Sequence, residues 1–117
     1  MSAPNIVNLT SMIGKTSMLE VTTSPASLLT NASDSGFVYK VNSILIANID
    51  GTNGASITVD IYRQSVAYPL AKLILVAATT SLEILSKSIY LEEGDAIMVT
   101  ASANGDLMSI TSYEIIA

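Results

Sequence analysis

Residues 56–62 alternate between polar and apolar side chains, and this pattern constrains the fold more than any other feature of the chain. Ile57, Val59 and Ile61 share one parity, while Ser, Thr, Asp and Tyr occupy the other. Successive side chains of a β-strand point to opposite faces, so a period of two predicts a half-buried strand. The pattern therefore favours a sheet with one face packed on a core.

Other segments have the same β-rich composition. Residues 37–49 form a longer run that the loop 50–54 joins to the first strand, and apolar residues occupy both parities in its second half. That half is expected to be covered on both faces. Residues 70–76 also fit a helical stripe, but Pro69, β-branched content and brevity favour a strand. Shorter candidate strands are residues 17–23, 27–30, 82–85 and 88–91.

The end of the chain predicts a hairpin. Asn104-Gly105 is a typical two-residue turn, and alternating segments flank it at 96–102 and 106–112. With this turn at the centre, Val99 would lie opposite Ile110, and Ala101 opposite Met108. Turn chemistry and alternation thus agree on one register.

About eight strands separated by frequent turns predict an all-β domain, an antiparallel β-sandwich of jelly-roll type. The domain is expected to comprise residues 16–117, after an extended N-terminal arm in residues 1–15. No composition shift, repeat or linker divides the chain further.

The composition limits the class of protein. Half of the 117 residues are hydrophobic and only 13% are charged, about half the usual charged fraction. A membrane-spanning helix is not expected, because the best apolar run, residues 70–78, is short and contains Lys72. The N-terminus has neither a basic nor an apolar signal region, so no secretion signal is expected. The remaining explanation is a subunit whose surface is covered by neighbours.

Few kinds of chemistry remain open. Without His or Cys, most transition-metal sites and the common nucleophilic pairs are excluded. The net charge is −5 and the five basic residues are scattered, which disfavours nucleic-acid binding. No catalytic residue, cofactor or metal site is predicted, although a pair of carboxylates could still form a hydrolase site.

Two groups of polar residues allow a structural or a functional interpretation. Asp50, Asn53 and Asp106 offer oxygen ligands for calcium, but Asp and Asn are also typical of turns, which is the preferred interpretation. Residues 92–95, Glu-Glu-Gly-Asp, are either an acidic binding loop or a turn, and the turn is preferred.

Outward tyrosines are the candidate contact residues. Tyr62 and Tyr90 have the parity opposite to their apolar neighbours, as expected at a protein interface or, alternatively, on a carbohydrate-binding platform. The arm contains apolar residues that could add a strand to a neighbouring chain. The predicted interface comprises Tyr62, Arg63, Tyr68, Tyr90, Ile6 and Leu9.

From residue 22 onward the chain resembles small virion structural proteins of tailed bacteriophages, especially of marine cyanophages. The segments that carry the resemblance are Lys-Val-Asn-Ser-Ile-Leu-Ile-Ala-Asn at 40–48, Ile-Thr-Val-Asp-Ile-Tyr at 57–62, Thr-Ser-Leu-Glu-Ile-Leu at 80–85, Ile-Tyr-Leu-Glu-Glu-Gly-Asp at 89–95 and Ser-Tyr-Glu-Ile at 112–115.

The resemblance implies a β-sandwich or jelly-roll module located in the virion and assembled in the host bacterial cytoplasm. It implies a non-enzymatic role, with coat or tail proteins and further copies of the chain as partners; a trimer is compatible with it. A capsid-decorating or cement protein is the first expectation. The alternatives are a structural module of the tail, neck or baseplate, and a module that binds a receptor or glycan.

Overall fold

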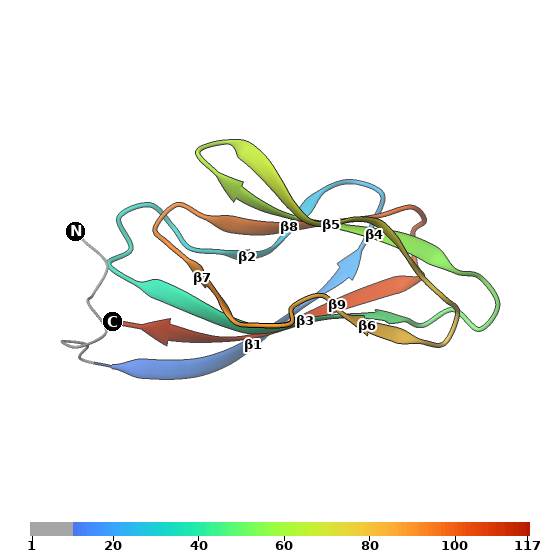
Figure 1. The fold of residues 1–117 in the computed structure, drawn as a ribbon, viewed down its shortest axis with the longest axis horizontal. Helices are drawn as coiled ribbons and strands as arrows, with labels where there is room; N and C mark the ends of the chain where they lie inside the picture. The colour runs from blue at the N-terminus through green and yellow to red at the C-terminus, as the bar shows by residue number, and fades with distance from the viewer. Residues whose placement is uncertain (1–10) are drawn as a thin grey trace.

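The computed structural model describes residues 11–117. They form two antiparallel sheets packed face to face, as Figure 1 shows, with nine strands among the described residues. Sheet A has the order β1-β9-β3-β6, with β7 also paired to β3, and sheet B has the order β2-β8-β4-β5. This wrapped order is that of a jelly roll, so the all-β sandwich prediction is confirmed.

The strands cover most of the described chain. Sheet A contains β1 (Met12–Val21), β3 (Val38–Asn48), β6 (Ser81–Glu83), β7 (Ile89–Leu91) and β9 (Leu107–Ile116). Sheet B contains β2 (Ala26–Thr30), β4 (Ala55–Arg63), β5 (Val66–Val76) and β8 (Ala96–Ala101). Residues 12–15, expected in the arm, thus belong to β1, and residues 1–10 lie outside the described part.

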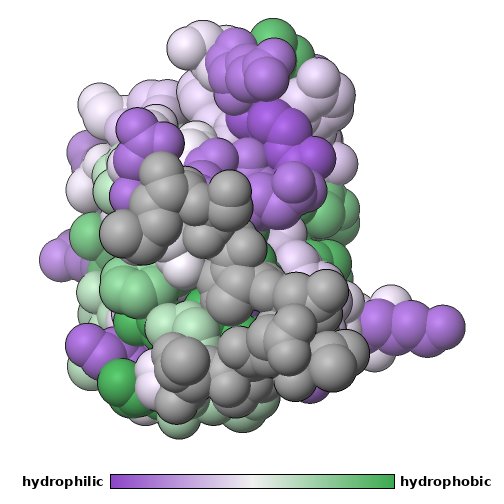
Figure 2. All heavy atoms as spheres, turned by 90° about the vertical axis from the view of Figure 1, so that its left-hand side faces the viewer, coloured by the Kyte–Doolittle hydropathy of each residue, from purple (hydrophilic) through white to green (hydrophobic). Residues whose placement is uncertain are grey.

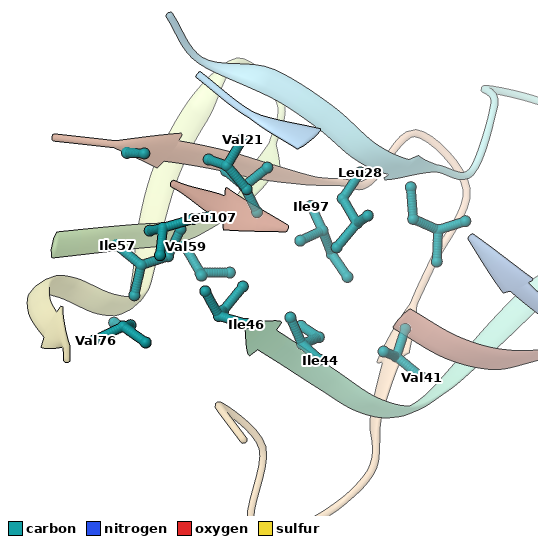
Figure 3. Close-up of a cluster of buried hydrophobic side chains, with 14 of the residues drawn as sticks. Val21, Leu28, Val41, Ile44, Ile46, Ile57, Val59, Val76, Ile97 and Leu107 are labelled. Carbon is teal, nitrogen blue, oxygen red and sulfur yellow. The ribbon is translucent and has the colours of Figure 1, made fainter. Parts of the chain in front are cut away.

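Aliphatic side chains from both sheets fill the core. Ile57 and Val59 on β4 are fully buried, as the alternation predicts, and they face Ile44 and Ile46 of β3 across the core (Figure 3). Fully burying one such side chain contributes about 1.5–3 kcal/mol. Tyr39 and Tyr113 extend the core toward one end, where their rings stack with centroids 5.4 Å apart.

A β-bulge explains the mixed parity of the segment 37–49. Val41 pairs with Tyr113 and Ser43 with Ser112, so Asn42 is an extra residue in β3. Because one extra residue exchanges the two faces of a strand, the inward side chains change from Tyr39 and Val41 to Ile44 and Ile46.

The predicted hairpin between residues 96–102 and 106–112 is wrong. Gly105 does adopt the left-handed turn conformation, with φ of 82°, but β8 pairs with β2 and β4 whereas β9 pairs with β1 and β3. The Asn104-Gly105 turn therefore takes the chain from one sheet to the other. Two strands that face each other across a core show the same alternation as two paired strands, so the pattern did not separate these cases.

Among the described strands, the directly paired neighbours in sequence are β4 and β5. Arg63 pairs with Val66, which leaves Gln64 and Ser65 as a two-residue turn. Both have positive φ, 52° and 64°, as a type I′ turn requires. Residues 70–76, for which a helix was the alternative, lie in β5.

Candidate assembly surfaces

Strand β5 carries an exposed apolar surface at the free edge of sheet B. Among the described residues, twelve large hydrophobic side chains are exposed, and six of them lie on this strand. Leu73 and Leu75 are the most exposed of the six, at 65% and 67%. Such a concentration is typical of a surface that another molecule covers. The β5 strip comprises Val66, Tyr68, Leu70, Leu73, Ile74 and Leu75. Ile74 pairs with Ile57 on the core side of the sheet and Leu75 with Ser56 on the outer side, so the strip wraps around the edge of the sheet.

The backbone of β5 is poorly suited to accept a further strand. Its register with β4 shifts twice, and Leu73 has φ of 52°. Pro69 lacks an amide proton, and Lys72 places a charge in the centre of the apolar strip. Irregularity, proline and lysine are the means by which edge strands avoid open-ended pairing. The β5 strip therefore offers side chains, rather than backbone hydrogen bonds, to a partner.

The β4–β5 hairpin rises away from sheet A at its tip (Figure 1). Ile61, Arg63 and Tyr68 line a cavity of about 410 Å³ there. Ile61 and Tyr68 are opposite each other in the register. Of the predicted interface residues, the structure thus brings Arg63 and Tyr68 together at the hairpin end of the β5 strip, to which Tyr68 belongs.

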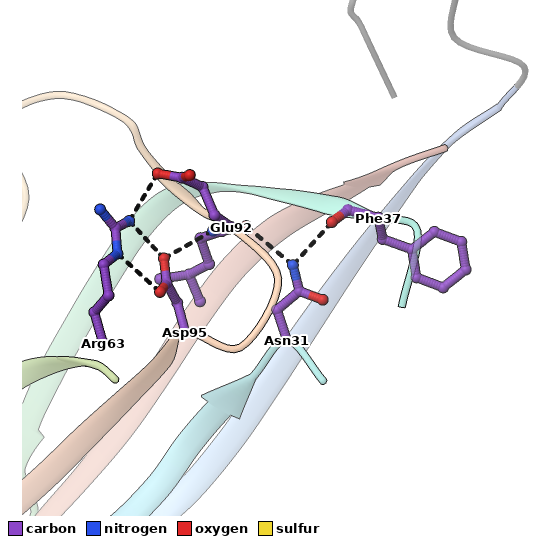
Figure 4. Close-up of polar contacts among 6 residues, drawn as sticks. Asn31, Phe37, Arg63, Glu92 and Asp95 are labelled. Carbon is purple, nitrogen blue, oxygen red and sulfur yellow. Dashed lines mark hydrogen bonds and ion pairs between the residues drawn. The ribbon is translucent and has the colours of Figure 1, made fainter. Parts of the chain in front are cut away.

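An ion pair fixes the tip to the turn between β7 and β8 (Figure 4). Arg63 donates from Nε and Nη2 to the two carboxylate oxygens of Asp95, at 2.9 and 2.6 Å, and Nη2 lies 2.9 Å from Glu92 Oε2. Asp95 is 2% exposed in its side chain and also accepts the backbone N–H of Glu92. The hydrogen bonds and charge of Asp95 raise the pKa of the Arg63 guanidinium above its ordinary range. Arg63 therefore has a structural role in addition to its place beside the strip.

The same region confirms a turn at residues 92–95. Gly94 has φ of 89°, and the N–H of Asp95 donates to the carbonyl of Glu92. Asn31 holds the adjoining loop through its amide, which donates to the carbonyls of Phe37 and Leu91. Hydrophilic side chains gather over the upper part of this end of the molecule in Figure 2, where Figure 1 places the hairpin tip.

A second apolar surface lies on the outer face of sheet A. Met18, Ile110 and Leu45 form one row across β1, β9 and β3, and Met108 and Ala47 continue it in the next row. Met18 is 67% exposed, and the other four are partly exposed. These five residues are the sheet A patch. Glu20 ends the second row and Glu83 the first, so a carboxylate flanks the patch on each side.

Strand β9 has its polar residues inside and its apolar residues outside along this stretch. Ser109 and Thr111 are fully buried, and their hydroxyls donate to the carbonyls of Leu19 and Ser43 at 2.8 Å. Met108 and Ile110, which the hairpin prediction set opposite Ala101 and Val99, point outward. A strand that satisfies hydroxyls inside while exposing larger apolar groups outside makes its outer face a candidate contact surface.

The two outward tyrosines lie on opposite sides of the sandwich. Tyr62 is on the outer face of sheet B, and Tyr90 is on β7, opposite Lys40 on the outer face of sheet A. The structure therefore does not bring them together into one platform. Ile6 and Leu9 lie outside the described residues.

Asp50, one of the calcium candidates, is occupied by turn hydrogen bonds. Asp50 accepts the backbone N–H groups of Thr52 and Asn53 at 2.8 and 3.1 Å, which lower the pKa of its carboxyl. The part of the chain that the structure describes holds no group of three or more acidic side chains placed to bind a metal ion. It also forms no helix long and apolar enough to cross a membrane.

Sequence reasoning missed the strip on β5 and the patch on sheet A. The run 70–76 was interpreted as a strand, but the pattern does not indicate whether a strand is central or at an edge. One pattern in the sequence could have indicated the sheet A patch. Met108 and Ile110 alternate with Ser and Thr of the opposite parity, so one face of the strand is apolar and the other carries hydroxyl groups. The hydroxyl-bearing face was the buried one.

Comparisons with solved structures found proteins of similar fold. A protein of Bacillus endospore appendages, which form a family of disulfide-linked pili, matches with a TM-score of 0.54 at 15% identity, over 99% of this chain and 95% of that one. This chain has no cysteine, so it cannot form such a link. At this identity the likeness shows the fold alone.

Two structures of a pentameric capsid protein from metagenomic phage sequences match less well. Their TM-scores are 0.43 and 0.44, at 15% and 16% identity, over 97% of this chain. The chain spans 63% and 65% of the length of those two proteins. No protein-family model and no curated protein matches the chain.

Proposed function

We propose that the protein is a non-enzymatic structural subunit of a bacteriophage particle, whose work is to hold neighbouring protein subunits. The observation that carries the proposal is the β5 strip, in which six large apolar side chains lie exposed on one edge strand. In a free protein such a surface favours aggregation, whereas in an assembly it supplies the contact area.

The low charge of the whole chain supports this role. Only 13% of the residues are charged, and the exposed surface includes two separate apolar regions. The virion assignment rests on the resemblance of the sequence segments between residues 40 and 115 to phage structural proteins. Within the particle, the preferred position is the outside of the capsid, as a decorating or cement protein.

A place in the tail, neck or baseplate is the alternative position, because neighbouring subunits there would cover the same two apolar surfaces as on a capsid. A glycan platform is not favoured: Tyr62 and Tyr90, its candidate residues, lie on opposite outer faces. The particle's own coat and tail proteins are thus the proposed partners.

The proposal is tested by native mass spectrometry and analytical ultracentrifugation of the full chain. The wild-type protein should form oligomers at micromolar concentration, and Leu75→Lys should shift it to monomer. Ile13→Lys is the matched control, because Ile13 is 52% exposed against 67% for Leu75 and lies on β1 five residues before Met18, outside both surfaces. It should leave the oligomer intact.

Co-sedimentation with purified capsids and purified tails of the phage then locates the protein. Binding to capsids that raises their melting temperature supports decoration, and binding to tails alone supports the alternative. A wild-type chain that stays monomeric at all concentrations and binds neither component contradicts the proposal.

A further inference from the structure

We infer that the β5 strip of one copy packs against the sheet A patch of the next copy, in a head-to-tail contact. This inference rests on the proposed function and names the partner of the same surface. Both surfaces are apolar, and they lie on different sheets of the sandwich. A single copy can therefore use both at once.

The charges within the two surfaces are opposite. Lys72 is exposed in the centre of the β5 strip, and within the described residues it has no ion pair. Glu20 and Glu83 flank the sheet A patch, next to Met108 and Leu45 in the register. Glu83 already accepts the backbone N–H groups of Ile44 and Leu85, so Glu20 is the carboxylate that the ammonium group of Lys72 meets when the strip covers the patch. Such complementarity fixes orientation and partner choice, while the apolar contact supplies the affinity.

Like-with-like contacts are disfavoured on the same grounds. Two sheet A patches face to face would bring Glu20 and Glu83 of one copy near the same carboxylates of the other. Two β5 strands side by side would bring Lys72 near its counterpart, and Pro69 with the shifted register would interrupt their pairing. Repulsion of this kind excludes alternatives that apolar contact alone would allow.

A contact between two unlike surfaces has a consequence for symmetry. Because the two surfaces lie on different sheets, one partner cannot cover both of them, so the contact does not pair reciprocally in a two-fold dimer. It instead generates a ring or, if the rotation does not close, a filament. The expected assembly therefore has three or more copies.

Charge exchange tests the contact in the full-length protein. Lys72→Glu and Glu20→Lys should each raise the concentration at half-assembly by about three- to tenfold, since each replaces an attraction with a repulsion. The double variant should restore assembly, because its charges are again opposite. Lys87→Glu, in the exposed bend before β7, makes the same charge change away from both surfaces and should have no effect.

The outcomes separate this contact from the function on which it rests. Restoration in the double variant, with circular dichroism unchanged in every variant, supports the contact. A wild-type assembly that neither single variant weakens, or a discrete two-fold dimer, overturns the head-to-tail contact and leaves the structural role standing. A wild-type chain that remains monomeric and binds no capsid or tail overturns the structural role itself.

Discussion

Two carboxylates in neighbouring loops, Asp50 and Asp106, have opposite pKa shifts because they have different hydrogen-bond partners. Backbone N–H groups of Thr52 and Asn53 stabilise the charged form of Asp50 and hold its pKa below the ordinary value of 3.8. Loss of hydration, together with the hydrogen bond and charge of Asp50, raises the pKa of Asp106. The two carboxylates therefore contribute to the acid stability of the fold with opposite signs.

The signs follow from linkage. Asp50 binds protons less readily when folded, so its contribution to stability is present above pH 3.8 and is lost on acidification. Asp106 binds protons more readily when folded, so the folded state gains from it as the pH falls. Asp50→Asn should therefore flatten the fall in the free energy of unfolding between about pH 4 and pH 2, and Asp106→Asn should steepen it.

Urea denaturation at a series of pH values measures both effects. Each variant serves as the control for the other, because both remove one carboxylate from the same pair of loops. Parallel pH profiles for the two variants would contradict the assignment of the shifts.

The β4–β5 hairpin has turn residues that do not match its geometry. Gln64 and Ser65 both adopt positive φ, a conformation that is strained for residues with a Cβ atom and favourable for Gly. Ser65→Gly should therefore raise the free energy of unfolding by about 0.5–1 kcal/mol. Gly105→Ala is the converse control. A Cβ atom there would meet nothing within 4 Å, so only the backbone angle φ of 82° opposes it. The free energy of unfolding is therefore expected to fall by about 1 kcal/mol.

Chemical denaturation of the two variants checks this expectation. A loss of stability in Ser65→Gly would show that the serine side chain contributes more than its backbone strain costs.

Individual elements were more predictable than their pairing. The alternation of β4 identified its buried face. The apolar residues at both odd and even positions of the segment 37–49 reflect the β-bulge at Asn42. The residue types at the turns did not predict the hairpin. Asn104-Gly105, a typical hairpin turn, connects the two sheets. The two-residue hairpin turn is Gln64-Ser65, which has no sequence signature. A strand's neighbours depend on contacts distant in sequence, which local pattern does not encode.

The candidate surfaces were predictable only in part, for the same reason. Arg63 and Tyr68 do lie together, at the hairpin end of the strip that contains Tyr68. The strip itself depends on β5 being the last strand of its sheet, and the patch depends on β9 burying Ser109 and Thr111 through hydrogen bonds to other strands. Neither condition is a property of the segment that carries the surface.

At the scale of the whole molecule, the described part of the chain is elongated, with extents of 49 × 26 × 20 Å. A thin sandwich has a small core relative to its surface, so contacts between copies are expected to add a substantial share of the stability. The melting temperature of the wild-type protein should then rise by about 5–10 °C over a hundredfold increase in concentration.

Leu75→Lys, which exposes a charge on the β5 strip, should melt at a temperature independent of concentration, equal to that of the dilute wild type. Ile13→Lys, on β1 outside both surfaces, should retain the wild-type slope. Differential scanning calorimetry from about 1 to 100 μM distinguishes these cases, a range over which assembly at micromolar affinity is titrated. Equal slopes for Leu75→Lys and wild type would mean that the strip does not contribute to association, whereas a flat wild-type profile would mean that the folded subunit is stable without neighbours. The slope thus connects one exposed leucine to the stability of the whole assembly.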